Sequence, residues 1–325
     1  MKTIRWGIIG CGDVTEIKSG PGFRNADHSE LTAVMRRNGE LAEDYAVRHG
    51  VPAWYDNAEN LINDPMVDAV YIATPPAFHK PYTILCAEAG KPVYVEKPMA
   101  LDYQECLEMI SACRSAGVPL FAAYYRRALK RFLKIKELTE SGILGDIRFV
   151  NVSLCMPPPK EDLNPRNLPW RVLPEISGGG RFVDMGSHML DILDFIFGPI
   201  REAKGISSNQ AGYYPAEDTV SGSFLFESGL HGSGRWCFTA YDSLDSTEII
   251  GSKGKLLFST FDDKPFRLIT SRGEEEFSFT YPVHIQEPLI QTVVNAINGT
   301  GSCQSTGESA ARTSRVMDIL LENYR

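Results

Sequence analysis

The sequence predicts an α/β fold with two domains, and three observations carry that prediction. At 325 residues the chain exceeds the size that one hydrophobic core usually organises. From residue 3 to about residue 122, short apolar runs alternate with helical stretches, as in a doubly wound parallel sheet. After residue 198, short alternating segments are separated by turns, which favours an antiparallel sheet. We expect domains at residues 1–123 and 124–325.

The first domain contains six apolar runs that we expect to be strands. The stretches between them read as helices with acidic or proline starts, for example residues 102–115, where Leu107 and Ile110 can face a sheet. Gly90 and Gly117 then follow two of these helices, in the position that glycine fills most easily. The expected strands are residues 4–9, 31–35, 51–54, 69–73, 93–95 and 119–122.

The pattern changes after Tyr124. A helix is expected to reach about Gly142, and a strand and a proline-rich loop over residues 156–180 follow it. We expect further helices at residues 184–197, 285–298 and 305–323. The antiparallel strands are expected at residues 219–226, 230–238, 246–250, 255–258, 266–269 and 275–279.

Composition excludes several classes of protein. No segment approaches the roughly 18 apolar residues of a membrane helix, and the chain enters a strand at once without a secretory signal, so we expect a cytoplasmic protein. The seven cysteines are scattered without a Cys-x-x-Cys pair, and we expect reduced, mostly buried thiols. A net charge of −8 argues against nucleic acid as a partner. The basic run over residues 126–136 is expected to be the solvated side of an amphipathic helix.

A glycine turn follows the first strand, in the run GIIGCGDVT of residues 7–15. Gly10 and Gly12, with Asp13 and Val14 opening a helix, would bring free backbone amides to a pyrophosphate. Thr15 stands where the third glycine of G-x-G-x-x-G is usual. The partial motif is weak by itself, but its place after the first strand of a βαβ pattern favours a dinucleotide site.

The second and fourth strands end in residues that suit the same cofactor. Arg36 and Arg37 stand where an NAD enzyme usually offers an acid to the ribose, so NADP(H) is favoured and NAD(H) stays possible. The alternative is two surface arginines without a ligand. Thr74 and Pro75 would form a stiff wall beside the nicotinamide ribose, and His79 would lie near the next helix start, as a lone histidine more typical of capping or packing.

The fifth strand runs into Glu96, Lys97 and Pro98. Proline removes a ladder hydrogen bond and turns the chain away from the sheet at its carboxyl edge, where open α/β folds bind ligands. We interpret Lys97 as facing a nicotinamide cofactor, with Glu96 beside it, and as helping a proton to leave a substrate hydroxyl. A surface Lys-Pro turn is the alternative.

The run GGGRFVDMGSHMLD of residues 178–191 is the strongest signal of the second domain. Asp184, His188 and Asp191 would share one helical face, and an imidazole beside a carboxylate can exchange protons near neutral pH. The alternative, with Asp184 as an N-cap and His188 in the core, matches the spacing equally well. A catalytic zinc ion wants three protein ligands, and the chain shows no His-x-x-x-His or cysteine cluster, so we expect no metal.

These motifs in this order resemble the Gfo/Idh/MocA family of glucose-fructose oxidoreductase and inositol dehydrogenase, over nearly the whole chain. The resemblance implies a Rossmann domain and a C-terminal α/β domain whose open, mostly antiparallel sheet serves as the interface of a homodimer or homotetramer. It implies that Lys97 and His188, aided by Asp184, meet the substrate hydroxyl, and that the Lys97–Pro98 bond is cis. Arg36 looks like the NADP-preferring branches.

The resemblance also implies substrate contacts at Tyr125, Arg126, Trp170 and Arg171. Many relatives have Asn in place of Tyr125 and an aromatic-x-Pro in place of residues 128 and 129, so the pocket is expected to differ in shape. The expected reaction is reversible hydride transfer between nicotinamide and a secondary alcohol or ketone of a sugar or cyclitol. Two other classes stay open: a redox-neutral glycosidase that holds NAD, and a non-enzymatic sensor of NAD(P) and sugar.

Overall fold

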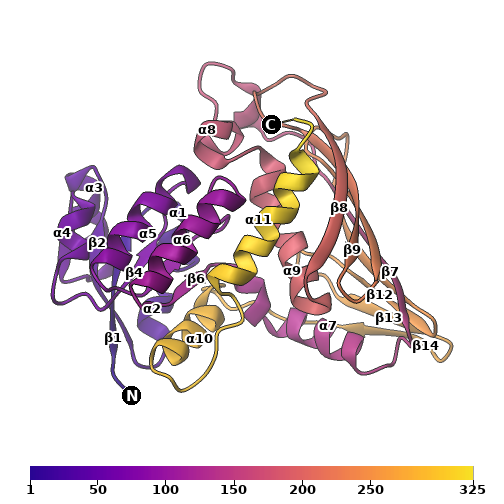
Figure 1. Ribbon diagram of the computed structural model, residues 1–325, viewed down its shortest axis with the longest axis horizontal. Coiled ribbons are helices and arrows are strands. Elements are labelled where there is room, and N and C mark those ends of the chain that lie inside the picture. The colour runs from indigo at the N-terminus through magenta and orange to yellow at the C-terminus, as the bar shows by residue number, and fades with distance from the viewer. Residues whose placement is uncertain (325) are drawn as a thin grey trace. The chain divides into compact units, whose positions relative to one another are not determined.

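The computed structural model describes residues 1–324 as two compact units (Figure 1). Unit 1 comprises residues 1–128 and 282–311, and unit 2 comprises residues 129–281 and the chain from residue 312 on. The predicted fold class is confirmed. The division differs from the two consecutive domains that we expected, because residues 282–311 return to the first unit.

Unit 1 is built on a parallel sheet of six strands in the order β3-β2-β1-β4-β5-β6. The strand order reverses direction between β1 and β4, and open α/β folds bind ligands in the crevice at such a point. Two strands have the predicted bounds and the others shift by one or two residues. The strands are β1 (Ile4–Ile9), β2 (Ser29–Met35), β3 (Ala53–Tyr55), β4 (Ala69–Ile72), β5 (Val93–Val95) and β6 (Leu120–Ala122).

Helices bury apolar side chains against both faces of this sheet. Asp102 caps α6 by accepting from Glu105 N at 2.8 Å, and Gly90 and Gly117 end α5 and α6 with positive φ of 68° and 69°. On one face, Leu289 and Ile290 of α10 join a core that contains Trp6, which is why residues 282–311 belong to unit 1. The helices are α1 (Asp13–Ile17), α2 (Gly22–Asn25), α3 (Gly39–His49), α4 (Ala58–Ile62), α5 (His79–Glu88), α6 (Tyr103–Ser115) and α10 (Glu287–Ile297), with 3-10 turns η1 (Pro76–Phe78) and η2 (Tyr125–Ala128).

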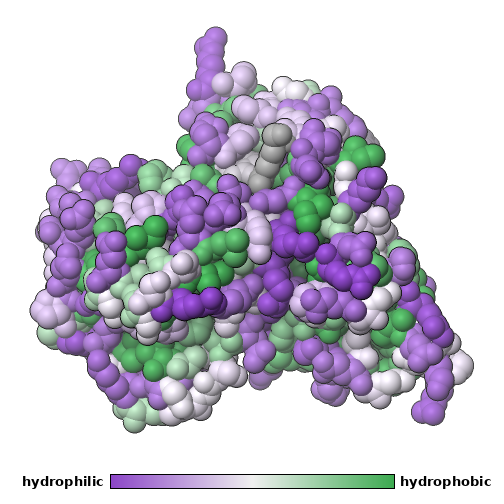
Figure 2. Space-filling model, in the orientation of Figure 1, coloured by the Kyte–Doolittle hydropathy of each residue, from purple (hydrophilic) through white to green (hydrophobic). Residues whose placement is uncertain are grey.

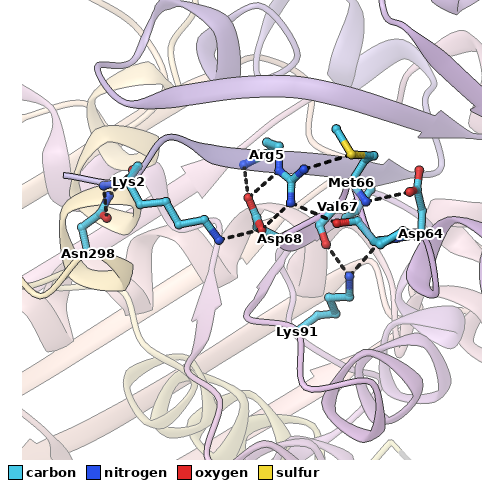
Figure 3. Close-up of polar contacts among 9 residues, drawn as sticks. Lys2, Arg5, Asp64, Met66, Val67, Asp68, Lys91 and Asn298 are labelled. Carbon is cyan, nitrogen blue, oxygen red and sulfur yellow. Dashed lines mark hydrogen bonds and ion pairs between the residues drawn. The ribbon is translucent and has the colours of Figure 1, made fainter.

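A polar cluster ties the amino-terminal edge of this sheet together (Figure 3). Asp68, just before β4, accepts from Lys2 Nζ at 2.8 Å and from Arg5 Nε at 2.9 Å. Burial opposes ionisation of Asp68, but the hydrogen bonds from Arg5 and Lys2 outweigh it and hold its pKa well below the usual range. Lys91, just before β5, donates to the carbonyl oxygens of Asp64, at 3.0 Å, and Val67. The opposite, carboxyl edge of the sheet stays available for function.

Unit 2 is built on an eight-stranded sheet in the order β14-β13-β12-β11-β7-β10-β9-β8. The β7 and β10 strands pair in parallel and the other neighbouring strands pair antiparallel. We did not predict β8. Its charged and small residues do not show the regular alternation of buried and exposed positions that identifies a strand with one buried face. The strands are β7 (Ile147–Cys155), β8 (Ile200–Ser208), β9 (Thr219–Phe226), β10 (His231–Cys237), β11 (Leu244–Gly251), β12 (Gly254–Phe258), β13 (Phe266–Thr270) and β14 (Gly273–Phe277).

Helices cover one face of this second sheet (Figure 1). A Cβ atom on Gly205 or Gly222 would lie within 2.8 Å of Leu320 Cδ2, so these glycines let α11 approach the strands closely. The other face carries half-buried and exposed polar side chains, and no described helix covers it. The helical elements are α7 (Lys130–Glu140), α8 (Pro174–Ser177), α9 (Ser187–Phe197) and α11 (Gly307–Leu321), with 3-10 turns η3 (Lys160–Leu163) and η4 (Trp170–Val172) and the π-helical turn η5 (Phe182–Gly186).

The basic run of residues 126–136 is only partly solvated, so our prediction for it was wrong. Arg131 is fully buried and donates to Lys264 O at 2.6 Å and to Ser259 O at 3.2 Å. Arg126 and Arg127 are also buried. Burial lowers the pKa of Arg131, and backbone carbonyl oxygens receive its guanidinium. The sequence pattern did not distinguish these buried arginines from Lys134 and Lys136, which are half-buried and pair with glutamates of α7.

None of the described helices is long and apolar enough to cross a membrane. The face of the molecule in Figure 2 is largely hydrophilic, with hydrophobic residues in small separate groups. The seven cysteines are free thiols in the structure, and five of them are buried, which confirms that most are buried as predicted.

Candidate active site

The glycine turn after β1 lies against the end of β4. Gly10 has φ of 89°, and a Cβ atom there would lie 2.9 Å from Thr74 Cγ2 and 3.0 Å from Thr74 N. A Cβ atom on Gly12 would meet only Gly10 O, at 3.9 Å. Protein packing therefore demands glycine at position 10, whereas the space over Gly12 is open to a ligand. Asp13 and Val14 begin α1 directly after this open space.

Two further features beside the turn fit a dinucleotide. Thr15, in the third glycine position of the motif, is buried. Its hydroxyl donates to Gly12 O at 2.7 Å and so stabilises the glycine turn. Thr74 Oγ1 is buried and has no hydrogen-bond partner among residues 1–324. Such an orphaned hydroxyl is costly unless a ligand completes it. Together with the space over Gly12, it fits a bound phosphate or ribose.

Arg36 and Arg37 follow β2 and are both exposed. Burial raises the pKa of Cys11 to about 11, and the charge of Arg36 opposes that rise, so the Arg36 guanidinium lies within electrostatic reach of the glycine turn. The Arg37 guanidinium lies over the ring of Phe78, 5.2 Å from its centre. Neither arginine forms an ion pair with another described residue. Both stay available to an anion at this edge.

A buried carboxylate anchors the turn that carries Lys97. Glu96 accepts from Tyr71 Oη at 2.5 Å and Gln286 Nε2 at 2.6 Å through one oxygen, and from Lys97 N at 3.1 Å through the other. Tyr94 Oη donates to Gln286 Oε1 at 3.0 Å. Burial, and secondly the charge of Glu96, raises the pKa of both tyrosines well above the usual value, so both hydroxyls keep their protons.

The Lys97–Pro98 peptide bond is cis, which confirms what the family resemblance implied. The backbone at Lys97 is thus held from one side by the Glu96 carboxylate and continues into a tight turn. A turn fixed in this way presents the lysine at the carboxyl edge of β5, on the same sheet as the glycine turn.

His79 is placed differently from a cofactor contact. Its side chain is fully buried, with Nε2 2.6 Å from Thr74 O, and Nδ1 3.1 Å from Pro98 O and 3.2 Å from Met99 O. The ring thereby links the loop after β4 to the cis turn after β5. We therefore correct its role from cofactor contact to positioning residue, because no ring atom reaches the surface of the chain.

Asp184 and His188 do not lie on one regular helix as we predicted. Asp184 belongs to the π-helical turn η5, whereas His188 lies in the first turn of α9. Packing demands glycine just before this turn: a Cβ atom on Gly179 would lie 2.4 Å from Val183 Cγ2, and one on Gly180 would lie 2.5 Å from Glu217 O. Single π turns inside helices are frequent at functional sites. The i, i+4 spacing of a regular α-helix therefore does not describe how these two residues are placed.

The structure joins three of the predicted residues in unit 2. Arg171 Nε lies 3.4 Å from Asp184 Oδ2, and the Arg171 guanidinium lies 4.5 Å from the centre of the Trp170 ring. His188 is 5% exposed and its ring meets the edge of Phe261 at 5.9 Å between centres. Asp191 is buried one turn further along α9. A carboxylate, a guanidinium, an aromatic plane and an imidazole thus lie on neighbouring elements of one unit.

In unit 1, Arg126 and Tyr125 form a pair of their own. Arg126 Nη1 donates to Tyr125 Oη at 3.0 Å, and its guanidinium lies 4.9 Å from the centre of the Tyr125 ring. Arg126 is 6% exposed, so the pair is preorganised by burial. The two residues follow β6, at the same carboxyl edge as Lys97.

Sequence reasoning missed the residues that hold these loops. Glu217 accepts from Gly180 N at 2.8 Å, and Arg181 forms a two-pronged ion pair with buried Asp162, with its shorter contact at 2.5 Å. Gln286 supports Glu96 from a segment 190 residues away. The sequence around Glu217, Asp162 and Gln286 contains no motif that marks them, because their roles depend on residues that are distant in the chain.

The comparisons with known proteins agree with this geometry. Residues 4–124 match the Gfo/Idh/MocA family described as an oxidoreductase family with an NAD-binding Rossmann fold, and residues 132–257 match the Gfo/Idh/MocA C-terminal domain. The chain belongs to the Gfo/Idh/MocA oxidoreductase family. It is an enzyme of the dehydrogenase and reductase type, on a fold that binds NAD.

Relatives of this family align over most of their length. The chain is 37% identical over 318 residues to Oxidoreductase P35 of Formosa agariphila, covering 97% of this chain and 98% of that one. It is 29% identical over 312 residues to 1,5-anhydro-D-fructose reductase of Ensifer adhaerens, covering 94% and 91%. Levoglucosan dehydrogenase, solved with NADH and levoglucosan, superposes with a TM-score of 0.87 at 21% identity, covering 98% and 96%, which is a likeness of fold.

Proposed function

We propose that this Gfo/Idh/MocA protein transfers hydride between a nicotinamide cofactor and a secondary alcohol or ketone of a sugar or cyclitol. The observation that carries the proposal is the turn anchored by Glu96, which follows β5 at the same sheet edge as the open glycine turn and contains Lys97. A reductase of an anhydro sugar among the relatives supports the substrate class.

The cofactor would be held along the carboxyl edge of the Rossmann sheet. Gly10, Gly12, Asp13 and Val14 would receive the pyrophosphate, while Thr74 and Pro75 would line the ribose and Glu96 and Lys97 the nicotinamide end. When bound, the nicotinamide accepts or supplies the hydride. The chain supplies the alignment and the proton transfer.

We assign the proton transfer to His188. Its imidazole would take the hydroxyl proton as the alcohol is oxidised and return it in the reverse direction, while Asp184 orients it. The Arg171 Nε atom, 3.4 Å from Asp184 Oδ2, would help to hold this carboxylate in place. Lys97 would stabilise the negative charge that develops on the substrate oxygen. Groups of these two kinds typically contribute on the order of 10²-fold or more each to the rate.

Polar side chains in each unit would bind substrate hydroxyls. Tyr125 and Arg126 form one hydrogen-bonded pair, and Trp170 and Arg171 form one stacked pair. Stacked and hydrogen-bonded arginines lose little conformational entropy when they bind a polyol. An aromatic plane beside guanidinium donors suits the apolar face and the hydroxyl groups of a sugar ring.

The reaction is tested with purified protein, each of the two oxidised cofactors and a panel of aldoses, anhydro sugars, cyclitols and sugar acids. We expect a rise in nicotinamide absorbance with at least one of these substrates, and a fall when the matching ketone meets the reduced cofactor. Hydrolysis of a glycoside without net absorbance change would instead identify a redox-neutral glycosidase. Cofactor binding without turnover of any sugar or glycoside would favour a sensor.

We further propose that the cofactor is NADP(H). Arg36 and Arg37 lie at the end of β2 without acidic partners, and Arg36 is within electrostatic reach of the glycine turn. Fluorescence titration is expected to show tighter binding of NADPH than of NADH, and Arg36→Ala should remove most of that difference. The matched control is Arg114→Ala, an arginine of α6 in the same unit whose side chain is 74% exposed. Equal affinity for the two cofactors in the wild type would contradict the proposal.

We propose that the uncovered face of the unit 2 sheet joins two or more copies of the chain. Ile206 on this face is 71% exposed and Leu244 is 39% exposed, and exposed apolar side chains of this kind favour association. Light scattering is expected to show a dimer or tetramer that Ile206→Asp weakens. Val47→Asp, at an apolar residue of α3 that is 76% exposed, is the control and should leave the assembly intact.

A further inference from the structure

The loop between β12 and β13 of unit 2 brings an aromatic ring to His188. The rings of Phe261 and His188 lie 5.9 Å apart between centres, with their planes inclined at 80°. Rings in this edge-to-face arrangement stabilise each other beyond the apolar area that they bury. Phe261 is the one aromatic residue of the loop over residues 259–265 and is half-buried, whereas residues 263–265 are exposed. The loop therefore packs its aromatic side chain against the residue to which we assign the proton transfer.

A carboxylate near the start of β11 holds the backbone where this loop begins. Asp245 accepts from Thr260 N with both oxygens, at 3.0 and 2.9 Å, and from Phe261 N at 2.7 Å. Hydrogen bonds from backbone amides to an ionised carboxylate are among the stronger ones in proteins. The amide of Phe261 itself is therefore fixed, and with it the point from which its side chain extends.

A fully buried arginine holds both ends of the same loop. Arg131 of α7 donates to Ser259 O and Ser259 Oγ, each at 3.2 Å, and to Lys264 O at 2.6 Å. Between these ends, Tyr281 Oη donates to Asp262 O at 3.2 Å. Connections between strands are usually among the mobile parts of a protein. Here a buried charge, whose burial is costly unless it is hydrogen-bonded, is used to keep the loop in one position.

An imidazole that transfers a proton must keep its ring in one orientation. The torsion that turns a histidine ring about its Cβ–Cγ bond is broad and roughly two-fold, so neighbouring groups have to select the orientation. Proton transfer requires the ring nitrogen within about 2.6–3.2 Å of the reacting hydroxyl. A tilted or flipped ring would place a carbon atom or the other nitrogen at that position. The ring of Phe261, set at 80° to the imidazole, restricts such rotation of His188.

We propose that Phe261 is a positioning residue for the imidazole of His188, and that Asp245 and Arg131 act on the reaction by fixing Phe261. The inference rests on the proposed function, since it concerns the group to which we assign the proton transfer. Removal of the Phe261 ring slows the step in which the proton moves. It should therefore lower kcat and leave the KM for the substrate and the affinity for the cofactor nearly unchanged.

The first test is steady-state turnover on the best substrate of the panel, with kcat expressed per cofactor-binding site so that misfolded protein does not count. Phe261→Leu keeps an apolar side chain but removes the ring, and should lower kcat on the order of 10-fold. Phe261→Tyr keeps the ring and should retain most of the wild-type kcat. The control is Tyr241→Leu, at an aromatic residue of the same unit that is 99% exposed, and it should match the wild type.

A double variant tests whether Asp245 acts through Phe261. Asp245→Ala should lower kcat by itself, but it should add no further loss to Phe261→Leu, because effects that pass through one residue are not additive. Asp245→Asn keeps an acceptor oxygen and takes the same place in the test if Asp245→Ala does not fold. Losses that multiply in the double variant would contradict the proposed route through Phe261.

NMR of protein with isotope-labelled histidine gives a readout that does not depend on turnover. The ring signals of His188, assigned by their absence in His188→Gln, should move in Phe261→Leu and in Asp245→Ala, while the signals of the other histidines stay in place. Unchanged His188 signals, or wild-type kcat in Phe261→Leu, would overturn the inference. Displaced His188 signals in a protein that turns over no substrate of the panel would instead contradict the proposed function and leave the positioning of the ring supported.

Discussion

Replacement of Glu96 tests whether a buried carboxylate holds the turn that carries Lys97. Glu96 is 8% exposed and receives Tyr71 Oη, Gln286 Nε2 and Lys97 N at 2.5, 2.6 and 3.1 Å. Hydrogen bonds to a charged group contribute about 1.5–3 kcal/mol each, and a buried donor left without its acceptor costs about 1–3 kcal/mol. The lost hydrogen bonds and the cost of the unsatisfied donors are partly the same contribution and cannot simply be added. We therefore expect Glu96→Ala to lower the free energy of unfolding of unit 1 by about 3–5 kcal/mol.

The measurement is urea unfolding followed by circular dichroism, with two companion variants. Glu96→Gln keeps one acceptor and the shape of the side chain, and should cost about 1–2 kcal/mol. Tyr71→Phe removes one donor but keeps the stacking on Tyr94 at 5.0 Å, and should cost about 1.5 kcal/mol. A Glu96→Ala loss below about 1 kcal/mol, the range of an ordinary surface substitution, would refute this account of the turn.

Three further predictions concern other parts of the chain. Asp68→Asn should lower the melting temperature of unit 1 at pH 7, because it weakens the ion pairs of the amino-terminal sheet edge; an unchanged melting temperature would contradict this. The hydrogen bond from Arg48 lowers the pKa of Glu16 to about 2, below its unfolded value of about 4.3, so this stabilisation is present above pH 4.3 and is lost between about pH 4 and pH 2. Arg48→Met should therefore reduce thermal stability at pH 6 but hardly at pH 2, and an equal loss at both would count against the assignment. Gly180→Ala should reduce activity and stability more than Gly142→Ala, because the Cβ atom on Gly180 would lie 2.5 Å from Glu217 O, whereas one on Gly142 would meet no atom within 4 Å and would cost only the strain of a φ of 78°.

The strands of unit 1 were predictable because a parallel sheet buried on both faces requires continuous apolar runs. Residues 4–9 and 93–95 form strands with the predicted bounds. The β8 strand escaped prediction, because it is an edge strand with one solvated face and a register shift near Ile200. The return of residues 282–311 to unit 1 depends on the packing of Leu289 and Ile290 against distant strands, which no local pattern encodes.

The local geometry of the candidate site was less predictable from the sequence than the order of the motifs that carry its residues. The cis bond at Lys97 and the pairing of Arg171 with Asp184 agree with the expected grouping of residues. The π-helical turn at Asp184 could not be read from the sequence, because an i, i+4 spacing fits a regular α-helix equally well. His79 resembled a site residue by its place after Thr74, but its ring is committed to three backbone carbonyl groups.

The most direct test of the proposed function is turnover by Lys97→Ala and His188→Ala, each compared with the wild type on the best substrate of the panel. We expect both variants to bind the reduced cofactor within a few fold of the wild type and to lose on the order of 10²-fold or more in kcat. Thr247→Ser, a conservative change in the core of unit 2, serves as the control for handling and folding and should keep its activity. Full turnover in both variants with cofactor binding intact would contradict the claim that Lys97 and His188 carry the reaction.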